Sequence, residues 1–209
     1  MQLYILNKDR ELIGIIDAYE YLRWTRRYSR CGSFELKADA STENSLLLVP
    51  GNILWKSDDD EAGIIEYVKL SETERETIAV SGRFATSLLS RRIIWSTETL
   101  NGDLSVCVGQ LLNNHIVNPS DVDRHIAGID YTPVFIGSPV NSQTSYRNLM
   151  DAVTDLCEAA NTGIRTVFDP DTKVFTVQLY KGAVSQTVFS KEYENLTGQT
   201  YTQSNLDYA

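Results

Sequence analysis

The sequence YLRWTRRYSRCGSFELKA, residues 21 to 38, contains the clearest strand pattern in the chain. Apolar and polar side chains alternate in its first part, and alternation with a period of two is the signature of a half-buried β-strand. This spacing places four residues on one face: Leu22, Trp24, Arg26 and Tyr28. After an interruption at Cys31-Gly32-Ser33, apolar residues resume the pattern and are expected to face inward: Phe34, Leu36 and Ala38.

Shorter strands are predicted on both sides of this segment. The apolar runs 3–6 and 12–16 flank the polar residues 7–10 and predict a hairpin. Three more strands are expected towards the C-terminus, at residues 52–56, 63–70 and 76–81, joined by polar tips at 57–61 and 71–75. Short, evenly spaced strands with polar turns are typical of a β-barrel or a β-sandwich.

Helical spacing of apolar residues begins after Gly82. A short helix is predicted from Phe84, Leu88 and Leu89, with Arg91 and Arg92 in its last turn, where cations suit the helix dipole. A second helix is expected to begin at an N-cap at Ser105, with one apolar stripe of Leu104, Val108, Leu111 and His115.

The last third predicts a helix followed by a hairpin. Thr144 or Ser145 is expected to cap a helix whose apolar stripe is Leu149, Val153, Leu156 and Ala160. Gly163 suits the left-handed position past the helix end. The strands of the hairpin are predicted at 164–168 and 173–180, around the turn 169–172.

Together these patterns predict a strand-rich α+β fold. Residues 1–95 are expected to form a barrel or sandwich-like domain, and residues 96–182 a mixed subdomain of helix plus hairpin. Residues 183–209 are interpreted as the start of a returning β-segment that is cut short, so the natural protein is expected to be longer.

Composition excludes several classes of function. The chain has 209 residues, 42% of them hydrophobic, as in an ordinary globular protein, and a formal charge of -9 argues against nucleic-acid binding. There is no signal peptide and no apolar run of membrane-spanning length, so synthesis in a cytoplasm is expected. Cys31, Cys107 and Cys157 lie far apart and are expected to be buried, reduced thiols.

No motif for catalysis or for a cofactor is present. The sequence lacks GxxxxGK[ST], GxGxxG and GxSxG, so we expect neither an enzyme nor a bound cofactor or metal. His115 is expected in the core or an interface, and His125 in a local ion pair with Asp121. The acidic run 58–61 is interpreted as a solvated hairpin tip.

Arg26 and Glu66 each lie alone on an apolar strand face in this interpretation. Two opposite charges are costly to bury separately and tolerable together, so a buried Arg26–Glu66 ion pair is one hypothesis. Loss of one partner would then cost about 3 to 5 kcal/mol. The alternative is that Arg26 merely extends to the rim of the barrel.

The run YEYLRWTRRYSRCGSFEL, residues 19–36, resembles a segment of siphophage tail hub proteins, with its W-x-R-R strand followed by glycine and F-E-L. The similarity resumes in order at VPGNI (49–53), GIIE (63–66), VSGRF (80–84), LL (88–89) and RRII (91–94), then at the helix 149–160, the hairpin after Gly163 and the segment 189–196.

This resemblance implies a structural function. Such proteins form the tail-tip or baseplate hub, commonly a trimeric ring, which links the tail tube to host-binding or wall-degrading parts. The expected partners are other tail proteins and further copies of the chain, in the virion tail. No catalytic residue is implied, and the structural or interface candidates are Trp24, Arg26, Arg27, Glu66, Arg83, Arg91 and Arg92.

Two other functions stay open. A carbohydrate-binding module is suggested by 11 tyrosines and by Trp24, Trp55 and Trp95, of which Trp24 is expected in the core. A hydrolase would need an acidic pair such as Asp121 and Asp123 in a cleft that raises one pKa.

Overall fold

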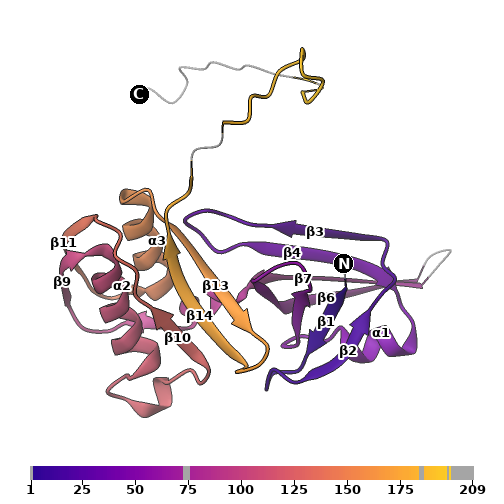
Figure 1. Ribbon diagram of the computed structural model, residues 1–209. Coiled ribbons are helices and arrows are strands. Elements are labelled where there is room, and N and C mark those ends of the chain that lie inside the picture. The colour runs from indigo at the N-terminus through magenta and orange to yellow at the C-terminus, as the bar shows by residue number, and fades with distance from the viewer. Residues whose placement is uncertain (1, 73–75, 184–185, 197, 199–209) are drawn as a thin grey trace, which may run out of the picture.

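The computed structural model describes residues 2–72, 76–183, 186–196 and 198. It has the predicted strand-rich α+β fold (Figure 1). A large antiparallel sheet made by the first half of the chain lies beside a smaller sheet that carries the two longer helices.

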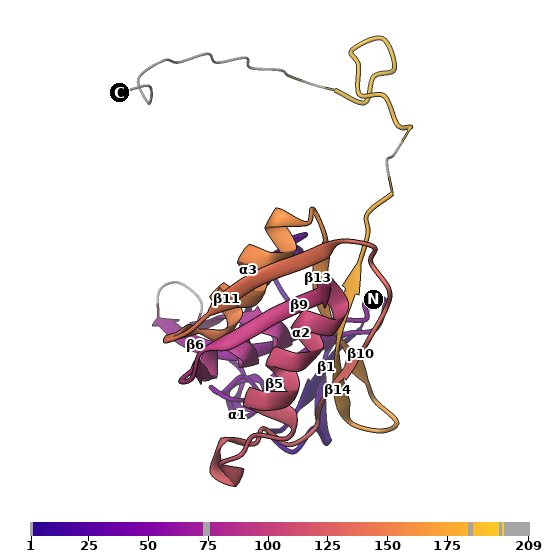
Figure 2. The same cartoon turned by 90° about the vertical axis from the view of Figure 1, so that its left-hand side faces the viewer.

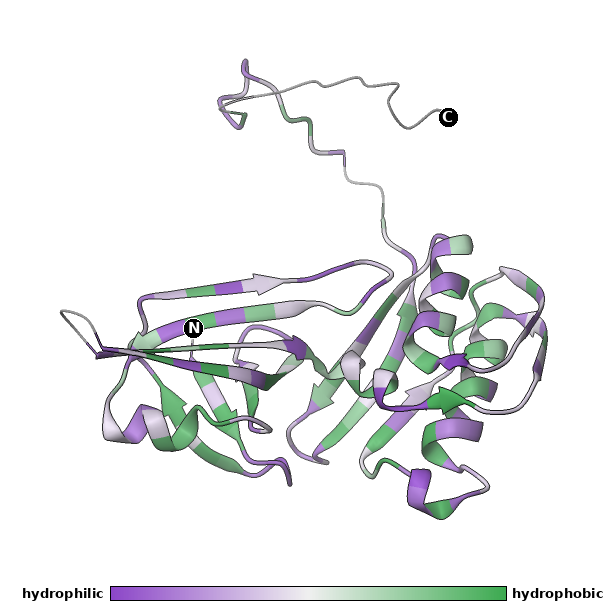
Figure 3. Ribbon diagram, turned by 180° about the vertical axis from the view of Figure 1, so that it is seen from behind, coloured by the Kyte–Doolittle hydropathy of each residue, from purple (hydrophilic) through white to green (hydrophobic). Residues whose placement is uncertain are grey.

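The large sheet contains seven strands in the order β2-β1-β5-β6-β7-β4-β3. Their bounds are β1 (Leu3–Leu6), β2 (Leu12–Ile16), β3 (Tyr21–Thr25), β4 (Ser33–Asp39), β5 (Ile53–Lys56), β6 (Ala62–Glu72) and β7 (Glu76–Phe84), with α1 (Thr42–Leu47) between β4 and β5. The strands and the N-terminal hairpin are close to their predicted positions, but β3 ends at Thr25, so the prediction that Arg26 and Tyr28 continue this strand is wrong. Hydrophobic and hydrophilic residues alternate along several of these strands in Figure 3.

The expected barrel is not closed. No pairing joins the edge strands β2 and β3 within the described residues. The sheet nevertheless curls, because Leu3 and Ile5 of β1 share one core cluster with Phe34 and Leu36 of β4, although three strands separate β1 from β4. The fold is thus an open, sandwich-like sheet.

A bulge and a close approach of backbones lie at the centre of this sheet. The β6–β7 register shifts between Ile65 and Tyr67, which leaves Glu66 as the extra residue. Gly82 of β7 is so near β6 that a Cβ atom there would lie 1.8 Å from the carbonyl oxygen of Ile64. Bulges bend a strand and increase its twist, which is consistent with the curl of the sheet.

The second half begins with a 3₁₀ helix, Ala85–Arg91, where a short helix is predicted. The remaining elements are β8 (Ile93–Ile94), β9 (Glu98–Asp103), α2 (Leu104–Leu112), the π-helix Asn113–Val117, the 3₁₀ turn Val122–Arg124, β10 (Ile129–Thr132), β11 (Pro139–Thr144), β12 (Arg147–Asn148), α3 (Leu149–Ala159), β13 (Gly163–Asp169) and β14 (Val174–Tyr180). The β13–β14 hairpin is antiparallel, and β10 pairs with β14 in parallel.

Three predicted helix boundaries are wrong. Asp103, not Ser105, caps α2, because its carboxylate accepts a hydrogen bond from the Ser105 amide. Asn148, not Thr144 or Ser145, caps α3. The positive φ past α3 belongs to Asn161. Gly163 instead begins β13, where the Tyr180 ring lies over it and leaves no room for a Cβ atom.

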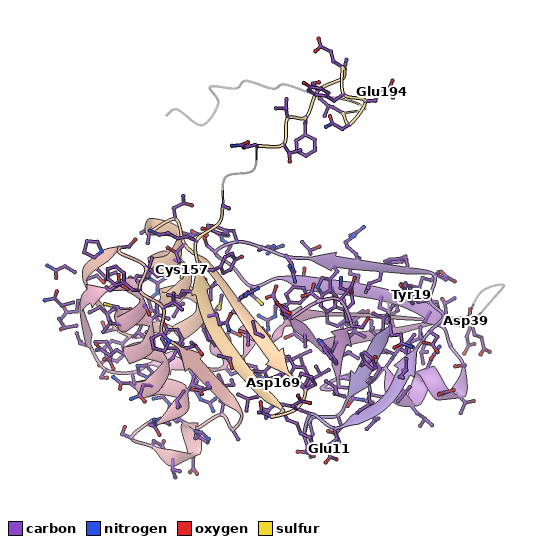
Figure 4. All side chains as sticks on the ribbon, in the orientation of Figure 1. Glu11, Tyr19, Asp39, Cys157, Asp169 and Glu194 are labelled. Atoms are coloured by element: carbon purple, nitrogen blue, oxygen red, sulfur yellow. The ribbon has the colours of Figure 1, made fainter. Side chains whose placement is uncertain are left out.

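One large apolar cluster connects the two halves. It joins Leu6, Ile53 and Ile64 of the large sheet with residues of α2, α3, β13 and β14. Side chains fill the space between the large sheet and the β13–β14 hairpin (Figure 4). Glu11 and Asp169 mark the end where the first hairpin meets the last, and Arg10 there donates to the carbonyl of Lys173 at 3.1 Å.

The predicted division at residue 95 stays a prediction. β8 lies just before it and pairs with β12 of the second half. Of the predicted returning segment 183–209, the described residues contain no strand, and residues 184–185, 197 and 199–209 lie outside the described part.

The three cysteines are free thiols: Cys107 and Cys157 are buried, and Cys31 is partly buried. Burial raises the pKa of Cys31 to about 11 and that of Cys157 to about 12.

Candidate functional site

A cluster of charged residues lies where the large sheet meets β13, and we call it the junction cluster: Arg26, Lys56, Asp59 and Glu61. The β5–β6 turn, residues 57–61, carries both carboxylates. Its backbone is fixed from both sides, because the Trp55 indole donates to the carbonyl of Asp59 at 2.9 Å and the Phe168 amide donates to that of Asp60 at 2.8 Å. Glu61 also forms an isolated bridge with Val167 of β13.

The two carboxylates are buried and share one partly exposed cation. The side chains of Asp59 and Glu61 are 3% and 9% exposed, whereas that of Arg26 is 52% exposed. The Arg26 guanidinium donates to Asp59 Oδ1, and its Nε lies 3.6 Å from Glu61 Oε2. Lys56 Nζ lies 3.7 Å from Asp59 Oδ2. The acidic turn 57–61 is therefore part of the contact between the large sheet and β13. The prediction that it is a solvated tip is wrong for Asp59 and Glu61.

The surroundings of Glu61 raise its pKa to about 7. Burial is the main cause, because it penalises the charged form, and the negative charge of Asp59 acts in the same direction. The positive charge of Arg26 opposes the shift. Glu61 is thus the group in the junction cluster that can change charge near neutral pH.

The predicted Arg26–Glu66 pair is wrong. Glu66 binds Arg83 instead, with Arg83 Nε 2.9 Å from Oε2 and Arg83 Nη2 2.7 Å from Oε1. Glu66 is the extra residue of the β6 bulge, so strict alternation does not give its position correctly. Both side chains are partly exposed, and the pair lies on the outside of the sheet.

Three predicted candidates, Arg27, Arg91 and Arg92, lie outside the junction cluster, whereas Lys56 Nζ lies 5.9 Å from the centroid of the Trp24 ring. Arg92 donates to the carbonyl oxygens of Arg124 and Arg91, at 2.6 and 2.9 Å. Arg91 is exposed beside a hollow that Lys8 and Arg10 also line. Arg27 is exposed and has no polar partner within the part of the chain that the structure describes.

The three tryptophans have different environments. Trp24 packs against Phe34 and Phe84, with ring centroids 5.8 and 4.6 Å apart, as expected for a core residue. Trp55 stacks on Tyr4, with ring centroids 5.1 Å apart, and its indole N–H donates a hydrogen bond to the carbonyl of Asp59 in the junction cluster. Trp95 is 60% exposed and remains free to contact another molecule.

The histidines and the acidic pair show no catalytic arrangement. His115 is buried, as predicted, with Nε2 3.3 Å from Glu98 Oε1. The predicted ion pair of His125 is wrong, because its Nδ1 lies 2.9 Å from the carbonyl oxygen of Val117 and not beside Asp121. Asp121 instead caps the following 3₁₀ turn through the amide of Asp123.

Two features are absent from the described residues: a cluster of metal ligands and a membrane-spanning helix. No three His, Cys, Asp or Glu side chains gather there as a set of metal ligands. No helix of that part combines the length and the apolar character needed to span a bilayer.

Comparison with families of proteins identifies the chain. The model of the siphovirus ReqiPepy6 Gp37-like proteins matches residues 2–209, almost the entire sequence. The chain belongs to this family. The predicted membership of a siphovirus tail-protein family is thereby confirmed. A search among curated sequences found no match to this Gp37-like chain.

Solved structures show that the Gp37-like chain has the fold of phage tail proteins. The prophage tail protein gp18 from Listeria monocytogenes matches with a TM-score of 0.53 and 11% identity, over 85% of this chain and 50% of its own. A tail protein from Neisseria meningitidis matches with a TM-score of 0.52 and 10% identity, over 84% and 49%. A chain of the Francisella PdpA-VgrG complex matches with a TM-score of 0.54 and 10% identity, over 96% and 30%.

The Gp37-like chain therefore spans about half the length of the two tail proteins that it resembles.

The structure brings together two sets of residues that the sequence patterns did not predict. Asp59 and Glu61 lie in an acidic run that resembles a loop tip, and the short apolar run of β5 before it was the only signal of their burial. No local pattern in the sequence indicated the contacts of Glu98, because its partners lie 12 to 17 residues later, on α2 and on the π-helix.

Proposed function

We propose that this protein is a structural component of the phage tail and forms part of the tail-tip or baseplate hub. In this function it connects the tail tube to host-binding or wall-degrading parts and catalyses no reaction. The observation that carries the proposal is the fold, which follows two tail proteins over 85% and 84% of the chain. Membership of a siphovirus family supports the same conclusion.

The surface of the large sheet offers a place for subunit contact. β2 is an edge strand, and three of its apolar side chains are exposed: Leu12, Ile13 and Ile15. An edge strand presents unpaired backbone groups, and an apolar edge favours pairing with another chain. We therefore infer that β2 contacts another tail subunit, and that a closed ring, a trimer by family resemblance, is the assembled form.

The oligomeric state of the complete gene product tests this proposal. Light scattering should show a trimer, and Ile13→Lys should shift it towards monomer by placing a charge on the β2 edge. Leu70→Lys is the control, because Leu70 is also an exposed apolar residue but lies on β6 and not on β2. Immunogold labelling of virions should place the protein at the distal end of the tail. A strict monomer at high concentration, absent from virions, would overturn the proposal.

A further inference from the structure

A polar hollow of about 500 Å³ lies beside the C-terminal end of α2, away from the junction cluster. Figure 2 shows α2 and the segment that follows its C-terminal end. Trp95 and Ser96 line the hollow from the segment before β9, and Glu98 from the start of β9. The other lining residues are Asn114 and His115 of the π-helix, Asn118 and Ser120 of the loop after it, and Arg124 of the 3₁₀ turn.

Trp95 gives the hollow an apolar wall. Its side chain is 60% exposed, although tryptophan is usually well buried in a folded domain. No ring of the described residues stacks on it, in contrast to Trp24 and Trp55. A large flat indole at the rim of a polar hollow is suited to packing against an apolar face of a ligand.

Glu98 is held in a fixed orientation at the base of the hollow. Its Oε2 accepts a hydrogen bond from Gln110 at 2.9 Å, and Asn114 Nδ2 lies 3.2 Å from both carboxylate oxygens. His115 Nε2 is 3.3 Å from Oε1. These contacts order the carboxylate and its amide partners before any ligand arrives, which lowers the entropic cost of binding.

His115 is the second independent sign of a binding site. It is 3% exposed, and its ring atom Nδ1 has no hydrogen-bond partner among the described residues, whereas Nε2 lies 3.3 Å from Glu98 Oε1. Buried polar atoms without partners cost free energy and are rare in native proteins. His115 lies in the π-helix Asn113–Val117, and π-helical turns are uncommon and occur frequently at functional sites.

The charges of the hollow favour an uncharged ligand. Glu98 and Arg124 carry opposite charges and balance each other. Burial lowers the pKa of His115, which keeps its ring neutral at pH 7. The remaining polar groups are amides and hydroxyls, which exchange hydrogen bonds with hydroxyl groups in either direction.

We propose that this hollow binds a neutral saccharide unit, which stacks its apolar face on Trp95 and directs its hydroxyl groups to Asn114, Asn118 and Arg124. A sugar ring combines an apolar face with a rim of hydroxyl donors and acceptors, and this is the combination that the hollow offers. His115 and Glu98 position the amides around the ligand. The site does not depend on the hub proposal, because none of its residues belongs to β2.

A glycan array that carries neutral and acidic oligosaccharides tests the proposal on the complete protein. We expect binding to neutral glycans, and a loss of roughly fivefold in affinity for Trp95→Ala, which corresponds to about 1 kcal/mol for stacking on one aromatic ring. Glu98→Gln should weaken binding too, because an NH2 donor replaces one of the two oxygens that accept from Gln110 and Asn114.

Phe135→Ala is the matched control, because Phe135 is an exposed aromatic residue outside the hollow. This variant should bind as the wild type does. Unchanged melting temperature and oligomeric state of Trp95→Ala would show that only binding is lost. Absence of neutral glycan binding, binding of acidic glycans alone, or binding that Trp95→Ala leaves intact would overturn the proposal.

Discussion

At the scale of single residues, Arg26 and Arg27 are neighbours in sequence with opposite environments. Arg26 contacts two buried carboxylates, whereas Arg27 is exposed without a polar partner among the described residues. A buried carboxylate that loses its cation keeps its desolvation cost without compensation. The two arginines therefore form a natural pair for comparison.

Arg26→Ala should reduce the free energy of unfolding by about 1 to 3 kcal/mol, which is less than for a fully buried pair because Arg26 is half exposed and Lys56 remains. Arg27→Ala should change it by less than about 0.5 kcal/mol. Urea denaturation at pH 8 measures both variants. Equal effects would contradict the structural function of the junction cluster.

Glu61 should make stability depend on pH. Its pKa in the folded state, about 7, exceeds the ordinary value of 4.5, so the folded protein binds this proton more tightly than the unfolded chain does. The resulting stabilisation is fully present below about pH 4.5 and is lost as the pH rises through 7. Its upper limit is about 3 kcal/mol.

Glu61→Gln removes this titration. Between pH 5 and pH 8 the free energy of unfolding of the wild type should fall more steeply than that of the variant, as urea denaturation at each pH would show. Parallel pH profiles would mean that Glu61 titrates at its ordinary value in the folded protein.

The positions of individual residues were predictable where they followed from local alternation. Phe34, Leu36 and Ala38 are buried, as their spacing indicates. The partner of Arg26 was not predictable, because Glu66 was placed by counting through a bulge that the sequence does not mark. The Trp95 hollow joins segments up to about thirty residues apart, which only the folded chain brings together.

At the scale of elements, strands were easier to predict than the ends of helices. A strand repeats its signal over several residues, whereas a cap depends on one side chain. Asp103, Ser105, Thr144, Ser145 and Asn148 can all cap a helix, and the chain uses the two that directly precede a buried leucine, Leu104 and Leu149.

Gly82→Ala tests the close approach of β6 and β7. The added Cβ atom would lie 1.8 Å from a backbone oxygen, so the strands themselves must separate. We expect a loss of about 3 kcal/mol or more in the free energy of unfolding. Ser81→Ala, at the residue directly before Gly82 in β7, should lower the free energy of unfolding by less than about 1 kcal/mol. Thermal denaturation that showed the two variants to be equally stable would contradict this packing.

At the scale of the whole molecule, local patterns did not reveal which strands meet. Alternation predicts the strands of the large sheet, but β2 and β3 remain edges instead of closing a barrel. The core shared by the two halves also escaped prediction, because Leu6, Ile53 and Ile64 belong to one cluster with residues of α2, α3, β13 and β14 that lie far along the chain.

This shared core predicts one cooperative unfolding transition. Ile64 packs in the same cluster as residues of α3 and β13, so neither half can lose its structure without exposing the other. Calorimetry of the complete protein should give equal calorimetric and van't Hoff enthalpies for this part of the chain. Two separate transitions within it would instead support the independent domains that residue 95 was predicted to divide.

The place of β6 and β7 in the middle of the large sheet has a consequence for synthesis. β1 pairs with β5, and β4 pairs with β7, so the first hairpin waits for a strand that ends at residue 56 and the β3–β4 hairpin for one that ends at residue 84. Ribosomes add about 5 to 20 residues per second. The two hairpins therefore spend several seconds without their central partners, and the seven-stranded sheet can be completed only after β5, β6 and β7 have been made.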